Sequence, residues 1–421
     1  MRTEGASVAS VSGPASRTEI GLVYFAGLVQ GLALVTFPAL SAIFTGPDGF
    51  GFDSTRYGAM FVPQVVLAVL ASVLAPPLAA RGGLRRVLLL GIAGDIVSMT
   101  LLALSRLLLG APDSAFAVLL AATGALGLGF GATVMAINTY AEGFFPGQAD
   151  GAVLALNALL GLGTALAPVL VAIVTGMGVW WLLPLVVAFI LSLIFVLIFA
   201  VVLEKHGPAQ HPRSDLAMVR GAEGPSSAEA LPRRYWLYAT AVFLYGILET
   251  LNGNWAPLYL SGERGVSPRG ASMALAAFWA MVTVGRVLVA AISVRVPPRS
   301  IYLALPVLLL ITFQLASRVQ GEIGGILVFG MAGLACSAFL PLSISFGGSE
   351  FPRLSAVMAG GTIAFYQLGY GVAAFATGPL RDLMQLRFSM IFASASAIAV
   401  PLFVVAALIV RRPRVVPTLR R

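Results

Sequence analysis

Few ionisable residues lie inside the long apolar runs of this sequence, and Glu249 has the most informative surroundings among them. It lies within the run Phe243–Leu251, with Tyr245 one helical turn before it and Asn252 one turn after it on the same face. Burial in a medium of low dielectric constant favours the neutral form of a carboxyl group, so Glu249 can exchange protons near neutral pH. We therefore expect Glu249 to carry a proton or to contact a substrate. The alternative is a structural hydrogen bond to a neighbouring helix.

Asp95 and Arg286 also fall at depth in apolar runs. A charge at the centre of a bilayer costs about 2.5–3.5 kcal/mol on insertion scales, so each of these residues needs a partner or a role. For Asp95, a structural pair with a polar neighbour and a gating role both remain open. Arg286, which follows Gly285, is a candidate partner for an acid.

A set of amide, hydroxyl and aromatic side chains accompanies these charges. Such groups suit the binding of a small polar molecule, although each one alone is also suited to a hydrogen bond between helices. The candidate substrate-binding or coupling residues, besides Glu249, are Gln30, Asn138, Asn157, Asn252, Asn254, Trp255, Tyr366, Gln367 and Tyr370.

The composition indicates the medium around these residues. Of 421 residues, 59% are hydrophobic and only 10% are charged, and the mean hydropathy is +0.95. Soluble domains carry about 25% charged residues, so the excess apolar surface must face lipid. The single cysteine excludes a disulfide framework and a cysteine-based metal site. We predict an integral, multi-pass membrane protein.

The sequence shows no set of residues that would support enzymatic catalysis. The apolar runs contain no Ser/His/Asp set, no paired carboxylates and no phosphate-binding loop. The two histidines, His206 and His211, lie in a polar segment without another metal ligand nearby. We therefore expect no enzyme activity, no cofactor and no metal site.

Twelve apolar runs are long enough to cross a bilayer, which takes about 20 residues of helix. They predict an all-α fold with helices at about 20–44, 57–79, 87–109, 114–144, 150–174, 180–202, 235–260, 270–293, 301–317, 323–349, 354–378 and 388–410. The predicted organisation is a disordered tail (1–18), a six-helix bundle (19–202), a cytoplasmic linker rich in proline and polar residues (203–234), a second six-helix bundle (235–410) and a basic tail (411–421).

The positions of the basic residues predict the orientation. With the N-terminus in the cytoplasm, 18 of the 26 Arg and Lys residues lie on the cytoplasmic side, 7 lie on the outside and Arg286 lies within a span. This bias agrees with the positive-inside rule and places both termini in the cytoplasm. The net charge of +9 is thus mainly a topology signal, which argues against nucleic-acid binding.

The two halves repeat each other. Gly27, Gln30 and Pro38 in the first predicted helix align at one constant offset with Gly246, Glu249 and Pro257 in the seventh. Repeated halves are a hallmark of secondary transporters, which hold their substrate between the halves near the middle of the membrane.

This organisation resembles the major facilitator superfamily. The segment between the second and third helices carries a degraded form of that family's loop motif, in which Leu78, Ala79, Arg81, Gly83 and Arg85 match, whereas Ala80 replaces the acidic residue. Within the superfamily, residues 249–260 and 157–168 and Asn138 look like the fucose-permease type of sugar transporter. The acids that carry protons in that type correspond to Leu34 and Val134 here, so neither fucose nor that proton route is implied.

The resemblance also suggests gates. Glu142 and Glu350 occupy equivalent inner ends of the fourth and tenth helices. We expect Glu142 to face Arg81 and Arg85, and Glu350 to face Arg295 and Arg299, as two ion-pair clusters that close the cytoplasmic side. The family analogy also gives Arg286 a supporting role in the second inner gate. The alternative for the clusters is ordinary solvated interface charge.

The predicted function is secondary active transport of a small polar solute, sugar-like or another metabolite, by a monomer coupled to protons through Glu249 or to another cation. Arginine outnumbers lysine 25 to 1, which hints at a bacterial source and hence an inner membrane. The main alternative is a proton-coupled drug or metabolite efflux antiporter. Gly163 and Pro168 match half of the signature that antiporters carry in their fifth helix. Ala167, Val171 and Ala172 depart from that signature. A channel is a third class, which the repeated halves disfavour.

Overall fold

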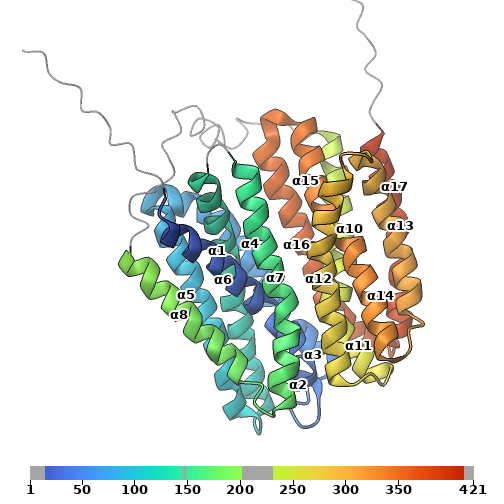
Figure 1. The fold of residues 1–421 in the computed structure, drawn as a ribbon. Coiled ribbons are helices and arrows are strands. Elements are labelled where there is room, and N and C mark those ends of the chain that lie inside the picture. The colour runs from blue at the N-terminus through green and yellow to red at the C-terminus, as the bar shows by residue number, and fades with distance from the viewer. Residues whose placement is uncertain (1–14, 146–147, 202–230, 412–421) are drawn as a thin grey trace, which may run out of the picture.

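The computed structural model of the chain describes residues 15–145, 148–201 and 231–411, and the elements in these ranges are helices (Figure 1). The first half contains α1 (Arg17–Ala39), α2 (Ser41–Thr45), α3 (Ser54–Ala59), α4 (Phe61–Gly82), α5 (Leu84–Leu104), η1 (Ser105–Leu108), α6 (Pro112–Phe144), α7 (Ala149–Gly176) and α8 (Leu182–Val201). The second half contains α10 (Arg233–Thr250), η2 (Leu251–Trp255), α11 (Ala256–Glu263), α12 (Pro268–Ile292), α13 (Pro298–Ala316), α14 (Gly321–Cys336), α15 (Phe339–Glu350), η3 (Pro352–Leu354), α16 (Ser355–Asp382) and α17 (Phe388–Val410).

These elements form twelve crossings, because several short helices continue a longer one. Within the described residues, ten crossings are long and apolar enough to span a membrane. The other two are α10 with η2 and α11, and α16. Both carry polar side chains at mid-length, and polar groups in a membrane face protein or a cavity and not lipid. The predicted all-α membrane fold of two six-helix bundles is confirmed.

The helix ends differ from the predicted boundaries by a few residues. Ser16 caps α1, since its hydroxyl accepts a hydrogen bond from Glu19 N and its own N–H donates to the Glu19 carboxylate, so the helix begins inside the predicted tail. α10 begins at Arg233, inside the predicted linker. Most of both predicted tails and of the linker, with His206 and His211, lies outside the described residues.

Close backbone contacts explain the pairing of helices, and they repeat in the two halves. A Cβ atom at Gly31 of α1 or at Gly163 of α7 would lie only 2.0 Å from a carbonyl oxygen of the other helix. A Cβ atom at Gly246 of α10 or at Gly369 of α16 would lie 2.4 or 2.0 Å from a carbonyl oxygen of its partner. Small residues let membrane helices approach closely, so glycines hold equivalent helix pairs together in the two halves. Of these four glycines only Gly246 belongs to the sequence repeat, and its counterpart Gly27 lies against the side chain of Leu156.

The two ends of the bundle differ. An even number of crossings places the start of α1 and the end of α17 at the same end, the upper end in Figure 1, which we call the terminal end. We call the end that carries α2, α3 and α11 the opposite end (Figure 1). At the opposite end, α3 of the first half packs against α16 of the second. A Cβ atom at Gly378 would lie 2.4 Å from the carbonyl oxygen of Ser54, so the two halves touch there through their backbones.

Candidate functional site

The helix that carries Glu249 changes its geometry directly after that residue. Residues Leu251–Trp255 form a turn of π-helix between α10 and α11, and all five are buried. A π turn inserts an extra residue and rotates the side chains that follow, and such turns often occur at functional sites. Here it faces α12, where Gly253 lies directly against the ring of Trp279.

A cavity lies between the two halves beside this π turn. Its apolar walls come from α1, α4 and α6 of the first half. Its polar lining consists of Gln64, Asn254, Trp279, Tyr366, Gln367 and Tyr370. A mostly apolar lining with a few convergent polar groups is typical of a small-molecule site. The cavity volume of about 70 Å³ is smaller than the roughly 300–1,000 Å³ of such sites, so a solute of sugar size would enter only if the cavity widened.

Four of the predicted binding residues therefore line the cavity: Asn254, Tyr366, Gln367 and Tyr370. Two of them are bonded to each other, because the amide of Asn254 donates to the hydroxyl oxygen of Tyr370 at 2.9 Å. This bond joins the π turn to α16, so it fixes the side of the cavity that belongs to the second half.

Glu249 lies beside the cavity and is only 5% exposed. Tyr245, Tyr366 and Arg286 are the polar residues near its carboxyl group. Tyr366 also lines the cavity, so it contacts both the carboxyl group and the space where a solute would lie.

Arg286 approaches this cluster from α12. Its Nε donates to the carbonyl oxygen of Ser337 at 3.2 Å, at the break between α14 and α15. Tyr245 bonds the neighbouring carbonyl, with its hydroxyl 2.6 Å from the oxygen of Cys336. Carbonyl groups at a helix break lack intrahelical partners, so Tyr245 ties this break to the acid-bearing helix α10, and Arg286 ties it to α12.

Asp95 forms a separate polar cluster in the first half. It is fully buried on α5 and accepts hydrogen bonds from Gln30 Nε2 at 3.2 Å and from Thr133 Oγ1 at 3.3 Å. Gln30, the residue equivalent to Glu249 in the repeat, is itself fully buried and does not line the cavity. The structure thus places Gln30 between helices, where it connects α1 to α5.

The remaining predicted binding residues lie outside the cavity lining. Asn157 Nδ2 donates to Asn138 Oδ1 at 3.0 Å, which links α7 to α6. Asn252 donates to the carbonyl oxygen of Leu248 in its own helix. Trp255 is fully buried, and its indole N–H donates to the carbonyl oxygen of a residue on α16 at 3.2 Å.

A group of contacts closes the opposite end, and we call it the closure contact. The carboxylate of Asp382 on α16 accepts hydrogen bonds from Thr55 N at 2.6 Å and Thr55 Oγ1 at 2.8 Å, in the first turn of α3. The hydroxyl of Tyr57 donates to the carbonyl oxygen of Asn254 at 3.0 Å, and its ring meets Trp255 edge to face. Three hydrogen bonds thus join the halves here, and all come from α3.

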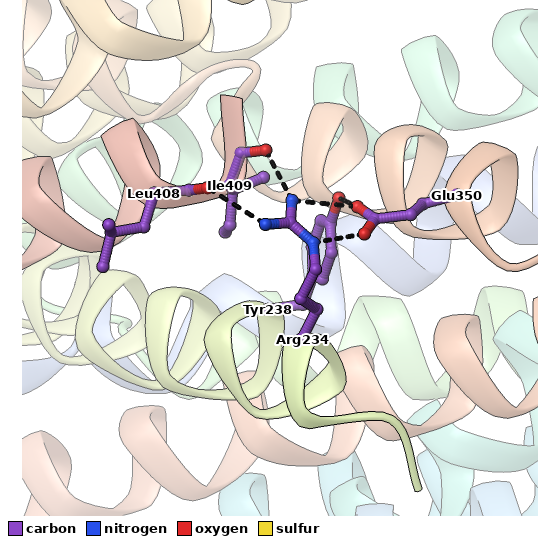
Figure 2. Close-up of polar contacts among 5 residues, drawn as sticks. All are labelled: Arg234, Tyr238, Glu350, Leu408 and Ile409. Carbon is purple, nitrogen blue, oxygen red and sulfur yellow. Dashed lines mark hydrogen bonds and ion pairs between the residues drawn. The ribbon is translucent and has the colours of Figure 1, made fainter. Parts of the chain in front are cut away.

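The terminal end shows a different arrangement from the predicted gate clusters. Glu350 at the end of α15 pairs with Arg234 at the start of α10, and not with Arg295 or Arg299 (Figure 2). Arg234 also donates to the carbonyl oxygens of Leu408 and Ile409 in the last turn of α17, at 3.3 and 2.8 Å. One guanidinium group thus ties together three helices of the second half, and Tyr238 adds a bond to Glu350 at 2.8 Å.

The other predicted gate residues lie at the same end. Arg81, Glu142, Arg295 and Arg299 are exposed. Arg85 donates to the carbonyl oxygen of Phe199 and lies 5.6 Å from the centre of its ring, so it contacts α8. Their gating role stays a prediction.

Gly83 explains one position of the loop motif. Its φ angle is +87°, a conformation that residues with a Cβ atom rarely adopt, and it forms the turn between α4 and α5.

Sequence reasoning missed several residues of the site. Gln64 is a single amide in an apolar run, and Trp279 is a single indole in another. Neither residue by itself indicated a binding site strongly. Thr55 and Asp382 carried none, because they lie near helix ends, where polar residues are common, and 327 residues apart.

Comparison with known proteins gives one family and many similar folds. Residues 20–321 match the family described as Major Facilitator Superfamily. No curated protein matches the sequence. The nucleoside transporter NupG, in a mutant form, is 12% identical with a TM-score of 0.73, over 93% of this chain and 100% of that one. A D-xylose-proton symporter is 14% identical with a TM-score of 0.69, over 94% and 97%. The E. coli fucose:proton symporter FucP, also a mutant, is 13% identical with a TM-score of 0.59, over 94% and 99%. At these identities the likeness concerns the fold alone.

Proposed function

Because this chain belongs to the Major Facilitator Superfamily, we propose that it moves a small polar solute across a membrane by alternating access, coupled to protons through Glu249. Membership in the family confirms the predicted resemblance and the expectation of a transporter and not an enzyme. It also agrees with a multi-pass integral membrane protein, given the ten apolar spans among the described helices. A bacterial inner membrane and a monomeric state belong to the proposal.

The position of Glu249 next to the cavity carries this proposal. Its carboxyl group shares Tyr366 with the cavity, so a change in its charge alters the hydrogen bonds available to a bound solute. Arg286 of α12 is a basic residue near this carboxyl group. An acid that lies deep in the membrane, beside a cavity and a basic residue, is placed to carry a proton in a transport cycle.

The closure contact supports alternating access. The two halves are bonded at the opposite end, below the cavity, through Thr55, Tyr57 and Asp382. If the terminal end is cytoplasmic, as the arginine distribution predicts, this conformation has its outer side closed. The cycle then requires that the closure contact breaks when the outer side opens.

The similar structures support a proton-coupled solute of sugar-like polarity. Two of them are described as proton symporters for D-xylose and fucose, and a third as a nucleoside transporter. The cavity of this chain offers amide, hydroxyl and indole groups, which match hydroxylated solutes of that kind.

Transport by purified protein in lipid vesicles tests the role of Glu249. With an imposed proton gradient, we expect the wild type to accumulate a solute that it also exchanges. Glu249→Gln keeps the shape of the side chain but cannot ionise, so we expect it to lose gradient-driven accumulation and to retain exchange. Glu263→Gln is the control, because Glu263 lies outside the cavity and bonds Ser389 within the second half. Full accumulation by Glu249→Gln would disprove proton coupling through this residue.

A further inference from the structure

Two polar atoms at the cavity have no hydrogen-bond partner. Gln64 Oε1 on α4 and Trp279 Nε1 on α12 are both buried, and both residues belong to the cavity lining. A buried donor or acceptor without a partner costs about 1–3 kcal/mol. Native proteins keep few such groups, and each one calls for an explanation.

Close contacts restrain the backbone of Gln64 and the indole ring of Trp279. A Cβ atom at Gly127 of α6 would lie 2.2 Å from the carbonyl oxygen of Gln64, so α4 and α6 touch through their backbones at this residue. A Cβ atom at Gly253 would lie 3.1 Å from Cζ2 of Trp279, so the indole ring rests on the π turn. Tyr370 is the hydrogen-bonding neighbour of the Gln64 amide. The two unpartnered atoms are thus positioned by the fold.

The unpartnered atoms are complementary and belong to different halves. Gln64 Oε1 is an acceptor from the first half, and Trp279 Nε1 is a donor from the second. The described residues that line the cavity include no Asp, Glu, Lys or Arg. Binding a charged solute here would leave its charge without a partner in the lining, which is costly in a medium of low dielectric constant.

We infer that Gln64 and Trp279 are the solute-binding pair of this transporter, and that the solute is an uncharged, hydroxylated molecule that donates to Gln64 and accepts from Trp279. This inference rests on the proposed transport function and narrows its substrate class. A solute bound in this way is bonded to both halves at once. Its binding therefore favours the conformation in which the halves approach each other around the cavity, which is the step that alternating access requires.

Binding to the full-length purified protein tests the inference, with D-xylose, L-fucose and uridine as uncharged probes and D-xylonate and uridine monophosphate as their charged counterparts. We expect the wild type to bind at least one uncharged probe and to bind its charged counterpart at least tenfold more weakly. Gln64→Leu and Trp279→Phe each remove one proposed bond and keep a large side chain at the position, so the dissociation constant of that probe should rise at least tenfold in each variant.

Thermal unfolding without any solute gives a second readout. Trp279→Phe loses ring atoms but no existing hydrogen bond, so its melting temperature should fall less than that of a tryptophan variant that also loses a bonded N–H. Trp255→Phe is the matched control, because it removes an indole N–H that is bonded to Ala373, and its melting temperature should fall.

Three results would overturn the inference: binding of only the charged probes, wild-type affinity in both variants, or a melting temperature of Trp279→Phe lowered as much as that of Trp255→Phe. Failure of the inference is distinct from failure of the proposed function. If proton-driven transport still depends on Glu249 while Gln64→Leu and Trp279→Phe bind as the wild type does, the coupling proposal stands and the substrate pair is wrong.

Discussion

Removal of the Asp382 carboxylate should shift this protein towards the conformation that is open at the opposite end. The carboxylate accepts two hydrogen bonds from Thr55, at 2.6 and 2.8 Å, across the boundary between the halves. The backbone N–H of Thr55 lies in the first turn of α3, where helix N–H groups have no intrahelical partner. Asp382→Ala therefore leaves a donor and a hydroxyl of the other half without their acceptor.

The size of the effect follows from the nature of these bonds. A hydrogen bond to a charged group contributes about 1.5–3 kcal/mol. Asp382 is half-buried, so water replaces part of the loss when the carboxylate is removed. We expect a net shift of about 2 kcal/mol, which changes the ratio of the two conformations roughly 30-fold, since about 1.4 kcal/mol corresponds to a factor of ten.

Distances between spin labels at the opposite end measure this ratio. Leu107 in the first half and Ile323 in the second are 77% and 75% exposed and accept labels without disturbing packing. The buried Cys336 is first replaced by serine, so that only the two introduced cysteines react. In Asp382→Ala we expect a larger population of long distances than in the parent protein.

Glu263 provides a matched control for this experiment. Its carboxylate also accepts hydrogen bonds from the backbone N–H and hydroxyl of a helix start, at Ser389, but both residues belong to the second half. Glu263→Ala should lower the melting temperature and leave the distance distribution unchanged. An unchanged distribution in Asp382→Ala, or an equal change in Glu263→Ala, would refute the role of the closure contact.

Two further predictions concern stability. Gly163→Ala places a Cβ atom 2.0 Å from a carbonyl oxygen of α1, so it should lower the free energy of unfolding by about 1–3 kcal/mol. Gly360→Ala is the control, because the space at its Cβ position is open, and it should not destabilise the protein. Thermal unfolding in detergent compares the two variants. Arg234→Ala removes the group that links Glu350 to the end of α17, so it should lower the free energy of unfolding by about 1–3 kcal/mol. Arg233 is the exposed neighbour, and Arg233→Ala should change the free energy of unfolding little. Equal melting temperatures within either pair would contradict the corresponding prediction.

Local features of the sequence determined the number and type of helices. A stretch of about 20 apolar residues is long enough to cross a bilayer. In lipid it can form all its backbone hydrogen bonds within itself only as a helix, so composition alone predicts a helix there. The repeat of Gly27, Gln30 and Pro38 in Gly246, Glu249 and Pro257 predicted the two similar halves in the same way. Glu249 was found because a carboxyl group in an apolar run is rare enough to need a cause.

The partners of each polar side chain were decided by the tertiary structure. Gln30 and Glu249 occupy equivalent places in the repeat, yet Gln30 faces Asp95 on α5, whereas Glu249 lies beside tyrosines and the cavity. The sequence also placed Glu350 opposite Arg295, on the same side of the membrane, whereas the structure pairs it with Arg234. Sidedness is a property of each helix alone, but the neighbour of a side chain depends on how helices pack.

The same distinction applies to the site as a whole. The amino-acid sequence established that this protein lies in lipid, with twelve helices and two acids at depth, Glu249 and Asp95, because lipid acts on each helix separately. Only the packing of the two halves brought Gln64 and Trp279 to one cavity and Asp382 to Thr55, because contacts between residues far apart in the chain depend on close approaches of helices such as that at Gly378.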